Sequence, residues 1–444
     1  MADKKLTTSA FSRMFKLGGL VSRIGVSMAG NAIANTFRSV DIKEIYRSAN
    51  IIRNANRLAE TLGNLKGLPM KIGQMLSLHE KFLPEEVAKI LSSLQQKAPS
   101  VPFYSILEMI KIELGDKFRK IKYINHEPYA AASIGQVHKA ILNDETEVVF
   151  KIQYPGIDKV IAADMKNLKG ILKIIFSMLT KVDLDKVWEE LNERLLEELD
   201  YEKEASNMLR MAEIYQNNPN IIIPEPILDL STSHILCMKI VEGISPERAC
   251  SNDFSKDLRD KWGQALYKSL MTGFFIHRFL HTDPNIANFA FREDGSIIIY
   301  DFGCVKEVPA QIVENYAKIC IAGLNRDYFK AQQLLKETGI HQIDEEPLSL
   351  EMISSYSEVL NKPFRTYPPY TYGKEETLYA PLIELGQKYW QEITSITFPK
   401  DIIFIHRTIG GHYGNLIKLE ATGPWRQILE EFCTIVLPKA ELLQ

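Results

Sequence analysis

Three polar side chains in the middle of the chain have the types and the spacing of a magnesium–nucleotide site. They are Asp283, Asn288 and Asp301, and Asp301 opens an Asp-Phe-Gly triplet after the apolar run 297–299. Carboxylate and amide oxygens in this order serve phosphoryl transfer, in which two side chains bind Mg²⁺ and one carboxylate orients the attacking group. We therefore expect Asn288 and Asp301 to be metal ligands and Asp283 to be the catalytic carboxylate.

A lysine that can neutralise phosphate charge follows the apolar run 148–150. We expect Lys151 to contact the phosphates of ATP or ADP; the alternative is a surface lysine at the end of a strand. A lysine in that role needs a carboxylate partner on a helix. Glu204 is the first candidate and Glu198 the second, and Asp200 lies on the same predicted helix. The alternative for each of these acids is a solvated helix face.

An alanine-rich segment stands where a phosphate-binding loop is expected, between the first two predicted strands. It supplies the candidate nucleotide-binding residues Ala130, Ala131, Ala132, Ser133 and Gly135. Glycine lets a backbone approach phosphate closely, and alanine does so less well. We expect this loop to cap the nucleotide with a geometry or preference that differs from that of a glycine-rich loop.

Lys71 and Gln74 are three residues apart in a predicted helix and share one of its faces. We expect them to reach into the catalytic cleft, where Glu198 or Asp200 would supply the opposite charge. The alternative is an ordinary helix kinked at Gly73.

The chain after the Asp-Phe-Gly triplet is short. Residues 304–309 lead almost directly into a predicted helix at 310–324, with no long activation segment and no Ala-Pro-Glu motif. The sequence therefore lacks a platform for a peptide substrate, which argues against a conventional protein kinase.

The composition excludes several classes of protein. The chain has 444 residues, 45% hydrophobic and 25% charged, which is typical of a soluble globular protein of two or three units. A net charge of −3 gives no reason to expect a nucleic-acid partner. The five cysteines are scattered and form no CxxC motif, which favours a reducing compartment and argues against a zinc site.

The N-terminal segment leaves two interpretations open. All charges between residues 4 and 40 are basic, and the most apolar stretch, 17–37, carries Arg23, Asn31 and Asn35, which are costly inside a bilayer. The segment is either a loosely packed terminus or a surface that touches an anionic membrane.

The order of predicted elements is a helical block, a small sheet with a long helix, a hinge and a second helical block. We expect an α+β, bilobal protein-kinase-like fold with a helical N-terminal extension. The predicted divisions are a flexible or membrane-proximal segment at 1–40, a helical extension at 41–102, an N-lobe with a long helical insertion at 103–243 and a helical C-lobe at 244–444.

These linked motifs resemble the UbiB family of atypical kinases, also called the aarF-domain family, over about residues 10–435. The motifs that carry the resemblance are Lys71-Ile72-Gly73-Gln74, the segments 130–137 and 151–156, Glu198-Leu199-Asp200-Tyr201 with Glu204-Ala205, Thr282-Asp283-Pro284-Asn285 with Asn288-Phe289, and Asp301-Phe302-Gly303. The segment with His406-Arg407 and Gly410-Gly411 is also similar to the family. Cys304 replaces a usual small residue, which would alter packing or make the site thiol-reactive.

The resemblance implies roles for several residues. Lys71 and Gln74 would lie at the nucleotide and block a peptide substrate, and Glu198 and Asp200 would hold their helix in place. The alanine-rich loop would suppress protein-kinase behaviour. The resemblance also implies Mg²⁺ and ATP or ADP as cofactors, slow ATP hydrolysis and support of ubiquinone biosynthesis.

The expected function is a magnesium-dependent atypical kinase or ATPase that serves ubiquinone or related lipid metabolism. The alternatives are a kinase for a small molecule or protein, and a nucleotide-gated lipid-handling scaffold. Expected partners are a membrane lipid or quinone precursor and proteins of quinone biosynthesis. We expect a cytoplasmic protein peripheral to a bacterial inner membrane, or alternatively one on the matrix side of a mitochondrion.

Overall fold

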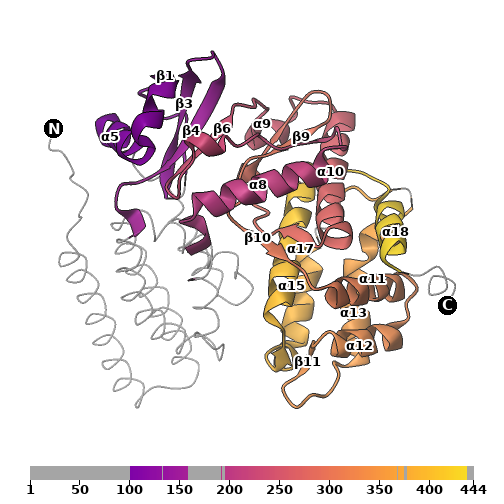
Figure 1. The fold of residues 1–444 in the computed structure, drawn as a ribbon. Helices are drawn as coiled ribbons and strands as arrows, with labels where there is room; N and C mark the ends of the chain where they lie inside the picture. The colour runs from indigo at the N-terminus through magenta and orange to yellow at the C-terminus, as the bar shows by residue number, and fades with distance from the viewer. Residues whose placement is uncertain are drawn as a thin grey trace, which may run out of the picture. The chain divides into compact units, whose positions relative to one another are not determined.

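The computed structural model describes residues 101–132, 134–158, 192, 196–367, 369–374 and 378–437 (Figure 1). Lys71, Gln74 and Ser133 lie outside the described residues, as do the predicted segment 1–40 and nearly all of 41–102. The chain divides into two compact units. The described part of unit 1 runs up to Glu202 and includes Ile227–Lys239, and the rest of the described chain forms unit 2. The predicted divisions at 40, 102 and 243 stay a prediction.

Unit 1 is built on an antiparallel sheet with the strand order β1-β3-β4-β6 and with β2 paired to β3. The bounds are β1 Ile121–Ile124, β2 Ala130–Ala131, β3 Gly135–Leu142, β4 Glu147–Gln153 and β6 Ile235–Lys239. The strands predicted at 121–124, 136–142, 147–153 and 234–241 are confirmed. Because β4 pairs with strands on both sides, six of its seven residues lie at least half-buried, as its apolar run 148–150 favours.

Among the described residues, helix α5 packs against the sheet of unit 1. In α5 (Phe103–Leu114), the residues Ile106, Ile110 and Leu114 recur at four-residue spacing and are buried against Phe150 and Ile152 of β4. The 3₁₀ helix η3 (Gly115–Lys120) then leads into β1, and a second short one, η4 (Leu228–Leu230), precedes β6. The core of unit 1 therefore lies between α5 and the sheet (Figure 1).

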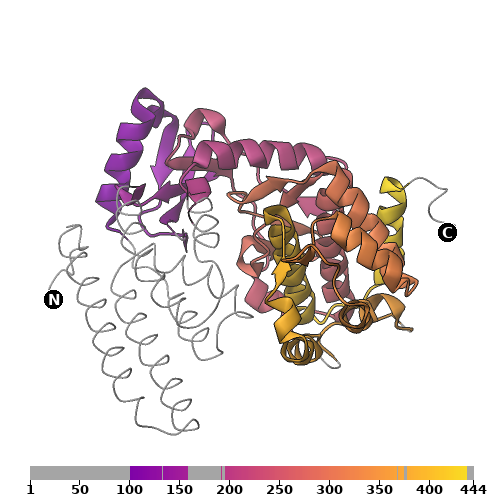
Figure 2. The ribbon, with the colours of Figure 1, turned by 90° about the horizontal axis from the view of Figure 1, so that it is seen from below.

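Unit 2 is mostly helical, as the sequence after residue 258 predicts. Its helices are α8 (Tyr201–Tyr215), which begins in unit 1, α9 (Pro246–Ala249), α10 (Lys256–Met271), the π-helix η5 (Thr272–Ile276), α11 (Ala310–Leu324), α12 (Tyr328–Glu337), α13 (Leu350–Leu360), α14 (Lys362–Arg365), α15 (Tyr379–Lys388), α16 (Trp390–Ile393), α17 (Lys400–Lys418) and α18 (Trp425–Val436). Within this unit α10 packs against α17 and α11 against α18 (Figures 1 and 2). No helix among the described residues is long and apolar enough to span a bilayer.

Short strands of unit 2 flank the segments that carry Asp283, Asn288 and Asp301. The parallel pair β5 (Ile221–Ile222) and β9 (Ile297–Ile299) is extended by β8 (Phe289–Phe291), which runs antiparallel to β9. β7 (Phe279–His281) pairs with β10 (Val305–Glu307), and β11 (His341–Gln342) pairs with β12 (Ile396–Thr397). The 3₁₀ helix η6 (Ile286–Asn288) stands between β7 and β8. Asn288 directly precedes β8, and Asp301 lies two residues after the end of β9.

Candidate nucleotide and metal site

The hairpin of β8 and β9 brings the two predicted metal ligands of unit 2 to one end. Asn288 directly precedes β8, and Tyr300 and Asp301 directly follow β9. The register pairs Phe289 with Ile299, and the Tyr300 amide donates to the Asn288 carbonyl at 2.9 Å. Residues far apart in sequence therefore meet because the antiparallel register places them opposite each other.

The loop with the predicted catalytic carboxylate is tied to the same end. The Asn288 side-chain nitrogen donates to the Asp283 carbonyl at 3.3 Å, so the side-chain oxygen of Asn288 is the atom available to a cation. The Asp283 carboxylate accepts from the Asn285 amide at 3.3 Å, and the Asn285 side chain caps η6 through the Ala287 amide. The loop is therefore fixed by its own side chains.

Hydrogen bonds hold the Asp-Phe-Gly backbone from several sides. The Asp301 carboxylate accepts from the Gly303 amide at 3.1 Å, and His281 Nε2 donates to the Asp301 carbonyl at 2.5 Å. The Thr282 amide donates to the Cys304 carbonyl at 2.9 Å, so β7 and β10 stay paired across this segment. The main chain of Asp301 is therefore positioned by residues that come immediately before Asp283.

Helix α8 holds the middle residue of the triplet. Glu204, 1% exposed, accepts from the Phe302 amide at 3.4 Å, and Asn207 donates to the Phe302 carbonyl at 2.9 Å. Glu204 was expected as the first partner of Lys151, and that pairing stays a prediction. The sequence analysis missed Asn207, although it lies three residues after Glu204 and so on the same helix face.

Helix α17 braces the Asp283 loop. Arg407 donates to the Thr282 carbonyl at 2.9 Å, and Asn415 donates to the Pro284 carbonyl at 2.8 Å. Between them lies Gly411, where a Cβ atom would stand 2.2 Å from a side-chain carbon of Pro284. Residues 407, 411 and 415 are spaced four apart and therefore share one face of the helix, and this spacing is the sequence signal that could have identified the face. No role was predicted for it from sequence.

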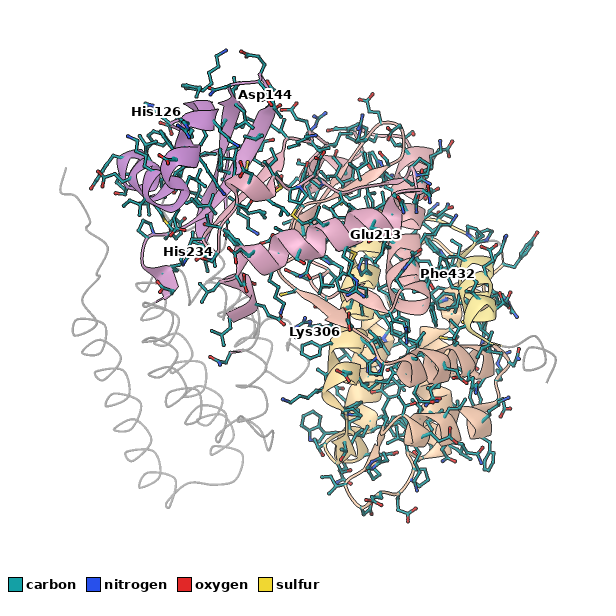
Figure 3. All side chains as sticks on the ribbon, viewed as in Figure 1. His126, Asp144, Glu213, His234, Lys306 and Phe432 are labelled. Atoms are coloured by element: carbon teal, nitrogen blue, oxygen red, sulfur yellow. The ribbon has the colours of Figure 1, made fainter. Side chains whose placement is uncertain are left out.

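The chain enters α11 soon after the triplet, as predicted for 310–324. Cys304 is 4% exposed, β10 follows it, and Pro309 is the N-cap of α11. Lys306 of β10, which Figure 3 labels, lies with its amine 5.5 Å from the ring centroid of Phe404 on α17. The described segment between the triplet and α11 is thus a short strand that pairs with β7 and places one side chain, Lys306, against α17.

Lys151 of unit 1 lies on the central strand β4. Its strand neighbours are Val137 on β3 and Leu236 on β6. The side chain is half-buried, and its amine lies 5.0 Å from the ring centroid of Tyr201, which is 1% exposed. A lysine amine is attracted to an aromatic face, and the stem can pack while the amine does so. Lys151 is therefore a positioned cation and not a loose strand-end lysine.

The alanine-rich loop forms the hairpin of β2 and β3. Ala130 and Ala131 are exposed on β2, and the Ala132 amide donates to the Gly135 carbonyl at 3.0 Å to close the turn. A Cβ atom at Gly135 would stand 2.1 Å from the carbonyl oxygen of Ile152. The single glycine of the loop is therefore required for the close approach of β3 to β4.

The segment with Glu198 and Asp200 is anchored to the end of β4. Gln153 is fully buried and donates its side-chain nitrogen to the Leu199 carbonyl at 2.9 Å and to the Ser233 carbonyl at 3.3 Å. The bond to Leu199 fixes the backbone between Glu198 and Asp200. Gln153 was not predicted from sequence as a site residue.

The side chains of unit 2 suit magnesium. Asp283, Asn288 and Asp301 offer hard carboxylate and amide oxygens, and all three are only half-buried. Mg²⁺ prefers such ligands and is usually held by one or two carboxylates together with substrate phosphates and water. The donor set therefore fits Mg²⁺ bound with a nucleotide.

Comparisons with known proteins identify the family of the chain. Residues 93–335, more than half of the chain, match the model of the ABC1 atypical kinase-like domain. The chain is 28% identical over 94% of its length to the probable serine/threonine-protein kinase abkA of Dictyostelium discoideum, of which it covers 78%. It is 27% identical, again over 94% of its length, to the mitochondrial atypical kinase COQ8B of Danio rerio, of which it covers 68%.

A solved structure shares the fold. The complex of Rv3197 with erythromycin from Mycobacterium tuberculosis matches with a TM-score of 0.63 and 26% identity, covering 88% of this chain and 98% of that one. The kinase-like α+β fold expected from the sequence is thereby confirmed. The chain belongs to the ABC1 atypical kinase-like family, which is the UbiB family that its motifs resemble, and it is an atypical kinase-like enzyme.

Proposed function

We propose that this protein binds magnesium with ATP or ADP and hydrolyses ATP. Asn288 and Asp301 would hold the metal, Lys151 the phosphates, and Asp283 would orient or deprotonate the attacking group. The observation that carries the proposal is the hydrogen-bonded cluster of the Asp283 loop, Asn288 and Asp301 at one end of the β8–β9 hairpin. Such a cluster holds its oxygens in place before a cation binds, which is the main requirement of phosphoryl transfer.

The metal would neutralise the charge that develops on the phosphate oxygens. The residues of the chain do the rest: Lys151 supplies a fixed positive charge, and Asp283, held by the Asn285 amide, presents its carboxylate to the attacking group. Water is the proposed attacking group, because the short segment from Cys304 to Pro309 offers no platform for a peptide. Phosphoryl transfer to a small molecule or protein is the alternative outcome.

The names of the relatives favour a role in quinone metabolism. Several are called COQ8 and mitochondrial. We propose that the protein supports ubiquinone biosynthesis, that it acts with a membrane lipid or quinone precursor and with other biosynthetic proteins, and that it works peripherally at a membrane. The membrane would be a mitochondrial inner membrane on its matrix side or a bacterial inner membrane.

ATP turnover in wild type, Asp301→Asn and the control Asp253→Asn tests the enzyme claim. Asp253 is an exposed residue of the same unit. We expect Asp301→Asn to lose at least about tenfold in turnover because it removes a metal-binding charge, and Asp253→Asn to match wild type. The assay is repeated with vesicles that carry an anionic lipid, which should raise turnover if a membrane surface is involved. Equal turnover in all three proteins would overturn the proposal.

A further inference from the structure

A small cavity lies within unit 2 beside His281, the residue that holds the Asp301 carbonyl. Its volume is about 20 Å³, and its walls include His281 of β7, His412 of α17 and Tyr215 of α8. A cavity of this size holds one water molecule if polar groups face it.

Two of the wall residues, His281 and His412, carry a buried imidazole nitrogen that has no hydrogen-bond partner in the described structure. His412 is 3% exposed, and its Nδ1 is buried without a hydrogen-bond partner in the described structure. The Nδ1 of His281 is also buried without a hydrogen-bond partner in the described structure. Because the Asp301 carbonyl can only accept, His281 Nε2 donates to it, and in the tautomer with its hydrogen on Nε2 the lone pair lies at Nδ1. That atom is an acceptor that requires a donor.

The rest of the wall cannot satisfy these atoms. Phe289 packs edge-to-face against both imidazoles, with its ring centroid 6.1 Å from that of His281 and 5.9 Å from that of His412, and offers no polar atom. The Tyr215 hydroxyl already donates to the Ser269 carbonyl at 2.8 Å, so only its oxygen lone pairs are left for the cavity. Buried polar groups of this kind are normally paired with an internal water.

We propose that one buried water bridges His281 Nδ1 and His412 Nδ1, and that His412 is thereby a positioning residue for Asp301. The water donates to His281, which keeps the His281 ring oriented so that Nε2 continues to hold the Asp301 carbonyl. His412 acts through two intermediates and does not touch the metal or the nucleotide. The role in turnover rests on the proposed function, whereas the effect on the backbone does not.

The chemistry of His412 suits this role. Burial, and secondarily the neighbouring His281, lowers the pKa of His412 to about 3, so the ring is neutral near pH 7 and has both a donor and an acceptor nitrogen. The ring comes from the helix that also braces the Asp283 loop through Arg407 and Asn415. One helix would therefore set the position of both carboxylate segments.

Three variants separate a polar bridge from packing. His412→Phe keeps a ring against Phe289 but removes both nitrogens, and His412→Asn keeps polar atoms near the Nδ1 position. Met211→Leu changes another wall residue of the cavity without changing its polarity. Amide hydrogen exchange of residues 300–304 is measured in the nucleotide-free protein, and kcat and KM for ATP are measured with Mg²⁺.

We expect His412→Phe to exchange about tenfold faster at Phe302 and Gly303 and to lose about tenfold in kcat with little change in KM, because the reacting geometry is loosened while binding contacts remain. His412→Asn and Met211→Leu should stay within about twofold of wild type. Unchanged exchange in His412→Phe would overturn the proposal, as would equal effects of His412→Phe and Met211→Leu. If wild type lacks turnover, the proposed function fails, and the exchange measurement still decides this inference.

Discussion

Asn415 donates its side-chain amide to the carbonyl of Pro284 at 2.8 Å, although the two residues are 131 positions apart. Pro284 directly follows Asp283, so the bond joins α17 to the loop of the proposed catalytic carboxylate. Arg407 makes a similar bond to Thr282 on the other side of Asp283. The Asp283 loop is thus held on both sides by one helix, and this brace should be required for activity.

Gly411 lies between Arg407 and Asn415 on α17, where the helix closely approaches Pro284, and it gives the first prediction. In Gly411→Ala the new Cβ would stand 2.2 Å from Pro284, so the loop or α17 must shift. We expect a loss of about 1–3 kcal/mol in the free energy of unfolding and a lower turnover. Denaturant unfolding and ATP hydrolysis measure the two effects.

The matched control is Gly410→Ala on the same helix. No atom lies within 4 Å of a Cβ built at this position. Alanine is preferred over glycine in a helix, so this variant should gain about 0.5–1 kcal/mol in stability and keep its turnover. If both alanine variants behave alike, close packing of α17 on the loop is not what makes Gly411 necessary.

Gln153 provides the second prediction, in unit 1. Gln153→Glu keeps the shape of the side chain but places acceptor oxygens against the Leu199 and Ser233 carbonyls. We expect a loss of about 1–3 kcal/mol in the free energy of unfolding and faster proteolysis near residues 198–200, because a buried donor is lost. Glu147→Gln at the exposed start of the same strand is the control. An intact 198–200 segment in Gln153→Glu would show that this bond does not anchor it.

Lys151 gives the third prediction. Lys151→Met keeps most of the packing of the stem but removes the charge beside Tyr201, so affinity for ATP should fall at least about tenfold. Lys139→Met on the neighbouring strand, whose amine lies 4.4 Å from the Tyr129 ring centroid, should bind as wild type does.

The same variant separates the proposed enzyme from a scaffold. Lys151→Met is tested for rescue of a ubiquinone-deficient strain, with quinone content as the readout. Failure of rescue agrees with a role that needs nucleotide. Full rescue by a protein that no longer binds ATP would mean that nucleotide is irrelevant to the pathway.

His412 makes stability depend on pH, which is the fourth prediction. Its pKa is lowered to about 3 in the folded protein, chiefly by burial, whereas an unfolded histidine has a pKa of about 6.5. Below about pH 6.5 the unfolded state therefore binds more protons than the folded state. The contribution of neutral His412 to the free energy of unfolding is complete above that pH and is lost as the pH falls. Between pH 7 and pH 5, wild type should lose about 2 kcal/mol more than His412→Phe. Urea unfolding at the two pH values measures this difference. If wild type and His412→Phe lose the same free energy of unfolding, the lowered pKa of His412 is contradicted.

The local parts of this structure could be predicted from sequence. The run 147–153 was predicted as a strand because it contains Val148, Val149, Phe150 and Ile152, and 310–324 was predicted as a helix with the bounds that the structure shows. Asn288 and Asp301 were also predicted to act together, because their types and their spacing around the apolar run 297–299 are those of metal ligands. In each case the physical cause acts within a few residues.

The bonds that hold the site could not be predicted in this way. Gly135 was read as part of a nucleotide-binding loop, yet its lack of a side chain is required by a strand that the chain reaches later. His412 gave no local signal, and the spacing of 407, 411 and 415 marks a helix face without naming its partner, because the partners lie more than 120 residues away and depend on how helices pack. Sequence patterns identify chemical groups, and tertiary packing decides which residues position them.

Calorimetric titration of ATP into the protein, with and without Mg²⁺, tests the central claim most directly. Wild type and Asp253→Asn should bind ATP at least about tenfold more tightly with Mg²⁺ than without it, because Asn288 and Asp301 add oxygen ligands to the metal. Asp301→Asn should lose most of that difference while it keeps metal-free binding. An equal magnesium effect in wild type and Asp301→Asn would contradict a magnesium–nucleotide site at the Asp-Phe-Gly segment.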